Sequence, residues 1–326
     1  MDTRWAVSVA AAAMVAATAA CAGAGEEDRS FPRDAEEFDV LFEEVSNWGR
    51  WGADDEVGTF NLITPEKRLE AAALVQSGVT VSLAHNPMTD EAPDNPPTAF
   101  EHTMAENLRS DTYRFSYHGY GVSHIDSLCH FAHNDRLYND TPTTASSPEG
   151  CGRLGIENLQ EGIVTRGILL DIPRLKGVPY LEPSTPIYTE DIEAWEEQAG
   201  LRVSSGDVIF IRTGRWARRA AEGPWQLSGN SAGIHASVVR WIRDRDVAFV
   251  GSDAATDVQP SMVEGVSLPV HTLLIAALGT NIFDNMDLEA LAETAASETR
   301  WEFMISAGPI PVIGGTGSPL NVIAIF

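Results

Sequence analysis

The chain has 326 residues, of which 44% are hydrophobic and 21% are charged, and its formal net charge is −25. This length suffices for one large domain or two small ones with a substantial core. The acidity, with a sequence pI near 4.5, argues against nucleic acid or an anionic membrane surface as a partner, because both require basic patches.

The N-terminus has the composition of an export signal. Residues 7–20 form an apolar run rich in Ala and Val after a short start that contains Arg4. This run is too short for a transmembrane helix, and it is followed by small residues and Cys21, which predicts an export signal over residues 1–20. Residues 18–21 also resemble a bacterial lipoprotein box, in which Cys21 would be lipidated, and plain signal cleavage is the alternative.

The remaining chain divides into a tether and a domain. Residues 21–37 are polar and predict a flexible tether, and residues 38–326 form the predicted folded domain. We therefore expect an exported protein, in the periplasm or at the cell surface, whose membrane contact is limited to a lipid anchor at Cys21.

Turn and cap residues mark the first predicted elements of the domain. Thr64 followed by Pro65 is a good helix start, and the helix should run to Gly78, where glycine ends it. A strand is expected over residues 79–83. Residues 84–110 are polar, contain four prolines and predict a long loop that could lie over a site.

Strands and helices alternate in the second half of the chain. Apolar strands are expected over residues 167–172, 208–211 and 247–250, and helices over residues 189–200, 236–243 and 269–278. A further strand end and helix fall within residues 281–295. This alternation predicts an α/β domain. No Gly-rich loop follows a strand and opens a helix, and no G-x-S-x-G elbow occurs, so nucleotide binding and serine hydrolysis by those motifs are not indicated.

Residues 117–133, YHGYGVSHIDSLCHFAH, are called the metal segment below and contain four of the eight histidines. His124, Asp126 and His130 form an H-x-D-x3-H pattern, and imidazole with carboxylate suits Zn²⁺, Mn²⁺ or Fe²⁺. In an extended chain the side chains at 124 and 126 point the same way. His130 would lie slightly further on, as a proton-transfer group rather than a ligand. A chance cluster of histidines on a surface loop is the alternative.

Two cysteines remain after Cys21. Cys129 and Cys151 could pair in an oxidising compartment, but two cysteines do not define a disulfide framework. Cys129 lies inside the metal segment, where it could be a thiolate ligand, a nucleophile or simply a small buried apolar residue. The sequence leaves this pairing open.

The metal segment and three other segments resemble one family. HIDSLCHF, at residues 124–131, resembles part of the H-x-G-T-H-x-D-x-P-x-H signature of the cyclase family, which includes bacterial kynurenine formamidase and isatin hydrolase. Residues 50–68, 269–291 and 314–326 resemble its longer branch of roughly 300 residues. The resemblance implies a single domain of the swivelling β/β/α type, a centre of one or two metal ions and hydrolysis of an amide bond.

The resemblance also implies roles for individual residues. His124 and Asp126 match metal ligands, and His130 matches the proton-transfer histidine. His271 matches a later histidine ligand, and Asp284 falls where short members of the family have a glutamate ligand. A divalent ion with an open position would acidify water, and His130 would take a proton from it and return the proton to the leaving nitrogen.

The sequence departs from the signature at several positions. The first histidine of the signature aligns with Tyr120, its glycine with Val122 and its proline with Leu128. His118, two residues before Tyr120, could take the place of the missing ligand if the loop were rearranged. Position 120 therefore bears on whether the site holds one ion or two.

Together these features predict a metal-dependent hydrolase of the arylformamidase type that cleaves a carbon–nitrogen bond in a small amide, formamide or lactam. The expected cofactor is one or two divalent ions, Zn²⁺ or Mn²⁺, and the expected partners are a small-molecule substrate and further copies of the chain. Two alternatives stay open. One is a lyase or cyclase that uses the metal to stabilise an enolate, and the other is a non-catalytic metal- or ligand-binding lipoprotein.

Overall fold

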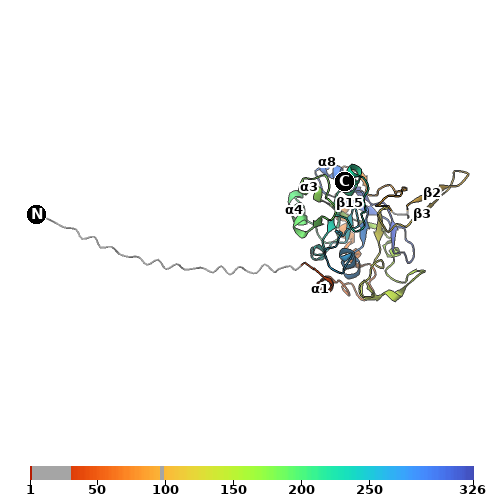
Figure 1. Cartoon of the computed structure of the whole chain (residues 1–326), viewed down its shortest axis with the longest axis horizontal. Coiled ribbons are helices and arrows are strands. Elements are labelled where there is room, and N and C mark those ends of the chain that lie inside the picture. Colours follow the sequence, from red (N-terminus) through yellow and green to blue (C-terminus); the bar gives the residue numbers. More distant parts are fainter. Residues whose placement is uncertain (2–30, 96–98) are drawn as a thin grey trace. The chain divides into compact units, whose positions relative to one another are not determined.

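A mixed β-sheet forms the centre of the computed structural model, which describes Met1, residues 31–95 and residues 99–326. Within these residues nine strands lie in the order β1-β17-β15-β9-β11-β13-β14-β4-β16. Their bounds are β1 Thr80–Ser82, β4 His124–Asp126, β9 Ile163–Asp171, β11 Val208–Arg212, β13 Phe249–Ser252, β14 Ile282–Asp284, β15 Glu302–Ala307, β16 Gly317–Pro319 and β17 Ile323–Ile325. The central strands β9, β11, β13 and β14 are parallel, and the flanking strands join them antiparallel. Figure 1 shows the whole chain and labels β15 of this sheet.

Helices connect these strands. The α-helices are α1 Ala35–Val45, α2 Pro65–Ala72, α3 Ile172–Lys176, α4 Thr189–Ala199, α5 Arg215–Glu222, α6 Val238–Asp244, α7 Pro269–His271 and α8 Glu289–Glu298. A π-helix, η4 Thr272–Leu278, continues α7, and the 3-10 helices are η1 Gly58–Leu62, η2 Thr143–Ala145 and η3 Ile156–Leu159. Short strand pairs lie outside the main sheet: β2 Glu101–Met104 with β3 Asp111–Arg114, β5 Arg136–Leu137 with β6 Thr141–Pro142, β7 Ser146–Ser147 with β8 Gly150–Cys151, and β10 Pro186–Ile187 with β12 Gly233–Ile234.

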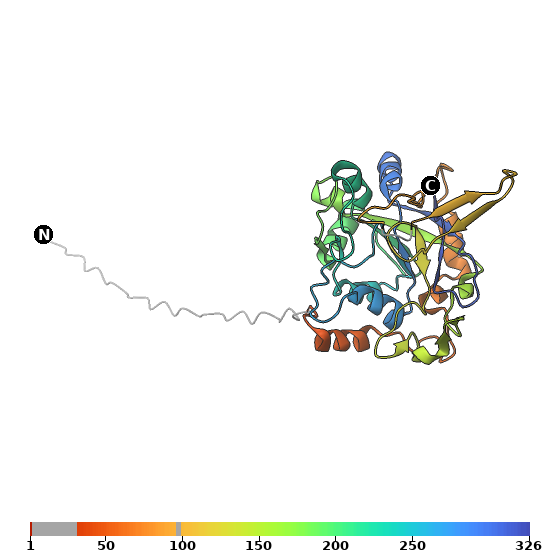
Figure 2. The same ribbon diagram turned by 45° about the vertical axis from the view of Figure 1, so that its right-hand side comes forward.

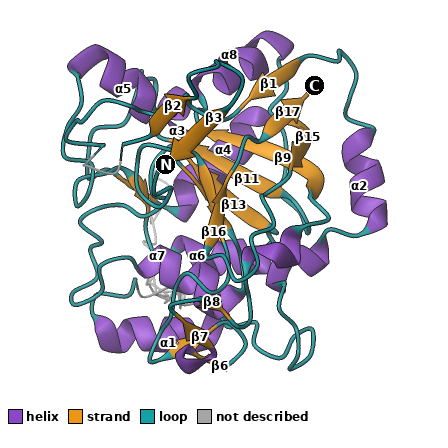
Figure 3. Cartoon of the chain, turned by 90° about the vertical axis from the view of Figure 1, so that its right-hand side faces the viewer, coloured by secondary structure: helices purple, strands orange, loops and turns teal. Residues whose placement is uncertain are grey.

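Alternate residues of the central strands face two separate apolar layers. In β11, Ile209 and Ile211 belong to one layer, whereas Val208 and Phe210 belong to the other. The first layer includes the buried sides of α1, α4, α6 and η4, and the second includes α8 and β17. Figure 3 shows α1, α6 and α7 on one side of the sheet and α8 on the other. Because both faces are covered, the strands are nearly continuous apolar runs.

The predicted α/β single domain is confirmed for residues 32–326, which form one compact unit around this large curled sheet. The predicted helix starting at Thr64-Pro65 is present, and the Thr64 side chain accepts a hydrogen bond from the backbone N–H of Lys67. It ends at Ala72 rather than near Gly78. The predicted helix over residues 269–278 is present as α7 and η4.

Two predictions about irregular segments are wrong in part. Residues 84–110 are not a continuous loop, because β2 lies within them and pairs with β3. Figure 2 shows this hairpin projecting from the body of the domain. Residues 35–37 of the predicted tether are helical, because Asp34 caps α1 and Phe38, Leu41 and Phe42 bury one face of it.

The export signal over residues 1–20, Cys21 and the tether up to residue 30 lie outside the described residues, apart from Met1. None of the helices in the described part of the chain has the length and apolarity that crossing a lipid bilayer requires.

Candidate metal centre

Strand β4 carries two predicted ligands on one face of the sheet. It is hydrogen-bonded on both sides, to β14 and β16, and all its residues are buried. His124 and Asp126 share a face because successive side chains alternate along a strand. Asp284 of β14 is the direct antiparallel partner of His124, so its carboxylate lies on the same face. Sheet register therefore gathers three predicted ligands from distant parts of the sequence.

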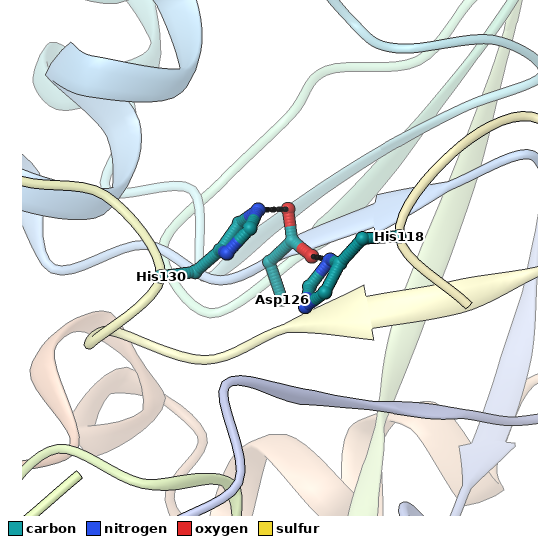
Figure 4. Close-up of side chains that lie close together, drawn as sticks. All are labelled: His118, Asp126 and His130. Carbon is teal, nitrogen blue, oxygen red and sulfur yellow. Dashed lines mark ion pairs between the residues drawn. The ribbon is translucent and has the colours of Figure 1, made fainter. Parts of the chain in front are cut away.

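Two imidazoles flank the Asp126 carboxylate, one beside each oxygen (Figure 4). His118 Nδ1 lies 3.0 Å from Asp126 Oδ1, and His130 Nε2 lies 3.9 Å from Asp126 Oδ2. The two rings are stacked, with centroids 3.8 Å apart and planes 7° from parallel. On its other side, His118 Nε2 lies 2.9 Å from the hydroxyl of Thr316. Thr316 orients the ring, and it lies in the C-terminal glycine-rich stretch without having been singled out from the sequence.

His271, the last residue of α7, adds another imidazole. Its Nε2 lies 3.1 Å from Asp284 Oδ2 and 3.8 Å from Asp126 Oδ2. Its Nδ1 lies 2.5 Å from Asp257 Oδ2, and Asp257 also accepts hydrogen bonds from the backbone N–H groups of Val270 and His271. Asp257 therefore fixes both the start of the helix and the orientation of the ring. Sequence reasoning missed this residue, because a carboxylate fourteen positions before a histidine gives no motif.

Hydrogen bonds on the far side of two rings leave their Nε2 atoms facing the cluster. His124 Nδ1 lies 2.9 Å from the carbonyl oxygen of Val122, to which it donates. His271 makes the corresponding contact with Asp257. When such a ring is neutral and its Nδ1–H donates to a carbonyl or carboxylate, Nε2 carries a lone pair, which is the usual arrangement of metal-binding imidazoles.

The electrostatics of the cluster favour a cation. Burial alone would raise the pKa of Asp126, but the surrounding imidazoles, His130 foremost, hold it well below its ordinary range. Burial lowers the pKa of His130 to about 4. For His271 burial acts in the same direction, but the carboxylates of Asp284 and Asp257 outweigh it and raise the pKa well above its ordinary value. The Asp126 carboxylate is therefore charged, and it stabilises positive charge placed beside it.

The donor atoms fall into two groups that share Asp126. His118, Asp126 and His130 form one, and His124, Asp126 and Asp284 form the other, with the ligand atoms of each group within 4.8 Å of one another. Bonds of about 2.1 Å to a tetrahedral ion place ligand atoms roughly 3.4 Å apart. Buried His118 Nδ1 and Asp126 Oδ1 lack a hydrogen-bond partner within the described residues, although they lie close together. The residues therefore fit one or two divalent ions.

Tyr120 stands where the first histidine of the signature aligns. Its backbone oxygen accepts a hydrogen bond of 2.8 Å from Arg215, and burial followed by the charge of Asp284 raises the pKa of its hydroxyl. The His118 side chain reaches Asp126. The sequence suggests that His118 could replace the missing histidine ligand, which requires this approach. Its ligand role, like those of His124, Asp126, His271 and Asp284 and the proton-transfer role of His130, stays a prediction that this geometry accommodates.

Cys129 and Cys151 form a disulfide with their Cα atoms 6.4 Å apart. The pairing that the sequence left open is therefore present, and Cys129 is neither a free thiolate ligand nor a nucleophile in this state. The bond ties the metal segment to β8.

Comparison with known proteins connects the fold to a family. The family model described as "Putative cyclase" matches residues 53–257, a range that contains the metal segment. A solved structure described as a novel cyclase is 33% identical with a TM-score of 0.76, and the match covers 86% of this chain and 99% of that one.

Two further solved structures are more distant. Isatin hydrolase A from Labrenzia aggregata is 20% identical with a TM-score of 0.51, and the match covers 78% of this chain and 94% of that one. Isatin hydrolase A from Ralstonia solanacearum is 17% identical with the same TM-score, and the match covers 80% and 97%. At these identities the similarity shows the fold alone. Among curated proteins, none matches the chain.

Proposed function

The chain belongs to the cyclase family, and from this premise we propose that it is a metal-dependent hydrolase that cleaves the carbon–nitrogen bond of a small amide, formamide or lactam. The family match and the isatin hydrolases among similar structures support hydrolase or cyclase-like chemistry. The arylformamidase-like choice of bond is our proposal. Isatin and N-formylkynurenine are the reference substrates.

One observation carries this proposal: the buried carboxylate of Asp126 lies within 4 Å of four imidazole rings. A lone buried carboxylate is costly unless a cation or several donors compensate its charge. Here the neighbours are imidazole rings, whose nitrogens are metal ligands when neutral, and a second carboxylate, Asp284, lies beside them. This set of ligand atoms is suited to a divalent ion. Without an ion, so many buried polar groups would be unfavourable as a purely structural network.

The proposed ligands are His118, His124, Asp126, His271 and Asp284, and the proposed metal is Zn²⁺ or Mn²⁺, both of which accept imidazole and carboxylate donors. When bound, such an ion polarises a carbonyl oxygen and acidifies water. Asp126 is shared by both groups of donor atoms, so it can serve a centre of one ion or of two.

His130 is the residue we propose to move the proton. Its pKa is lowered to about 4, first by burial, so its ring is neutral and able to accept a proton at neutral pH. Nε2 takes a proton from water as the carbon–oxygen bond forms. The same nitrogen returns the proton to the leaving nitrogen as the carbon–nitrogen bond breaks, and the products are an acid and an amine. Positioned proton transfer of this kind contributes about 10²–10⁴-fold to a rate.

We propose that the mature protein acts outside the cytoplasm, in the periplasm or at the cell surface, and that Cys21 anchors it by a lipid. The disulfide supports an oxidising location, because such bonds persist mainly outside the cytosol. We also propose that the protein associates into homo-oligomers.

Metal-dependent turnover tests the function. Protein stripped with a chelator should not hydrolyse isatin or N-formylkynurenine, and Zn²⁺ or Mn²⁺ should restore turnover. Asp126→Asn should lose both metal and activity. His130→Ala should retain metal and lose about 10²–10⁴-fold in kcat. His133→Ala is the matched control, because His133 lies in the same segment but pairs with Asp39 at 2.8 Å.

Turnover that survives complete metal removal would refute the proposal, as would full activity in His130→Ala with metal bound. Performing the reaction in H₂¹⁸O separates hydrolysis from a lyase or cyclase reaction. Hydrolysis introduces one labelled oxygen into the acid product, whereas enolate chemistry without water addition introduces none.

A further inference from the structure

We propose that Arg215 and Asn285 act as a clamp that fixes His118 in the metal centre, a positioning role that rests on the proposed function. His118 lies outside β4, so the register of the sheet does not set its position. The loop of residues 119–122, called the ligand loop below, leads from His118 to Ser123, which directly precedes His124. The geometry of this loop decides whether the His118 ring can reach Asp126.

The carbonyl oxygens of the ligand loop accept hydrogen bonds from outside the loop. Asn285 Nδ2 donates to Gly119 O and, at 3.4 Å, to Val122 O. Arg215 Nη2 donates to Tyr120 O at 2.8 Å. The fourth carbonyl, Gly121 O, accepts from the backbone N–H of Met88 at 3.1 Å. Two side chains therefore hold three of the four carbonyls in place.

The two side chains of the clamp are hydrogen-bonded to each other, and one of them directly follows β14, the strand that carries Asp284. Arg215 Nη1 donates to Asn285 Oδ1. Asn285 directly follows Asp284 and has a left-handed backbone, with φ of 56°. Its backbone oxygen accepts a 2.6 Å hydrogen bond from Ser123 Oγ. The clamp therefore joins the loop that carries His118 to the end of the strand that carries Asp284.

Arg215 is itself held rigidly. It begins α5, its side chain is 1% exposed, and its Nη1 also donates to Asp253 O at 3.3 Å. Asp94 Oδ2 lies 3.7 Å from Nη2. A planar guanidinium with several fixed acceptors loses little conformational freedom on bonding. It is therefore suited to position a loop, which a flexible lysine at this place would do less well.

Binding of Co²⁺ to the chelator-treated full-length protein tests the clamp, because its visible absorption reports the ligands around the ion. Arg215→Met and Asn285→Ala should each weaken Co²⁺ binding at least tenfold and produce the spectrum of His118→Ala. Arg219→Met is the matched control. Arg219 lies one turn further along α5 and shares Asp94, at 2.7 Å, but the bonds to the ligand loop come from Arg215.

A double mutant separates positioning from general destabilisation. If Arg215 acts through His118, the pair His118→Ala with Arg215→Met should bind Co²⁺ no more weakly than His118→Ala alone. Wild-type affinity and spectrum in both Arg215→Met and Asn285→Ala would overturn the inference. A loss that adds to that of His118→Ala, or an equal loss in Arg219→Met, would overturn it as well.

Separate control measurements distinguish a folding defect from a failure of the proposed function. Thermal unfolding of the metal-free variants identifies any that do not fold, and if Arg215→Met fails, Asn285→Ala and its double mutant with His118→Ala decide the outcome by the same criteria. Wild-type protein that binds Co²⁺ through the clamp but never hydrolyses an amide would leave the inference standing and refute the proposed function. Amide hydrolysis by the wild type, together with normal Co²⁺ binding in Arg215→Met and Asn285→Ala, would support the proposed function and refute the inference.

Discussion

Opening the disulfide should destabilise the domain by about 3 kcal/mol. Cys129 and Cys151 are 22 positions apart, and closing a loop of this size in the unfolded chain removes about 11 cal/mol/K of entropy, or roughly 3.4 kcal/mol at 25 °C. Cys151→Ser removes the bond with a nearly isosteric side chain at a half-buried position. The free energy of unfolding should fall by that amount, and the melting temperature by about 5 °C for a domain of this size.

Urea unfolding followed by tryptophan fluorescence measures the effect. Wild-type protein with a reductant and Cys151→Ser without it should have the same, lower midpoint, and reductant should not change the variant further. The dependence of the free energy on urea should become steeper, because an unlinked unfolded chain exposes more surface. Cys21→Ser is the control and should unfold like the wild type.

Equal stability of the reduced and oxidised proteins, within about 0.5 kcal/mol, would refute the loop-entropy reasoning. A loss far above 5 kcal/mol would also refute it. Such a loss would mean that the bond supports packing in the folded state, where Cys129 is 8% exposed, rather than restricting the unfolded chain.

Three further predictions follow from other parts of the structure. Chelation should lower the melting temperature, because a metal at 100 times its dissociation constant stabilises the fold by about 2.7 kcal/mol. A melting temperature that changes neither with chelator nor with added Zn²⁺ would contradict a metal centre. Thr64→Ala should cost about 1 kcal/mol in urea unfolding by removing the cap of α2, whereas Thr103→Ala on the exposed hairpin should cost little, and equal losses would exclude the cap as the cause. For Glu56, burial raises the pKa, but the backbone N–H of Leu154 and the side chain of Arg153 outweigh it, so the pKa is lowered below its ordinary value of 4.5. Its contribution to stability is therefore complete above that value and lost as the pH falls through the lower folded value. Glu56→Gln should accordingly be less stable than the wild type at pH 7, the two unfolding curves should converge in acid, and a constant gap from pH 7 to pH 3 would contradict the reasoning.

The sequence predicts those parts of the fold that local chemistry determines. The strand over residues 208–211 follows a Gly-Asp turn and is apolar throughout, and β11 occupies Val208–Arg212. Thr64-Pro65 predicts the start of α2 because capping involves only neighbouring residues. The same reasoning extends α2 past Ala72, because helix length depends on tertiary packing that the sequence pattern does not contain.

Long-range pairing limits what the sequence predicts about the site. The alternation of a strand suffices to place His124 and Asp126 on one face. The approach of His118 depends on Thr316, almost 200 residues away, and on the Arg215–Asn285 clamp. No local pattern specifies such contacts, because antiparallel register between distant strands is decided by the packing of the whole sheet.

The disulfide connects the metal centre to the cellular location that we propose. Cys129 lies between Asp126 and His130, so the bond to Cys151 is built into the segment that holds a proposed ligand and the proposed proton carrier. Reduction would free this segment at one of its anchors, and the ring of His130 depends on that anchor more directly than the residues of β4, which the sheet holds on both sides. A protein with this arrangement gains stability from an oxidising compartment at the place where we propose that its chemistry occurs. Cytoplasmic synthesis without residues 1–20 should therefore yield a reduced, less stable protein whose kcat falls more than its metal content.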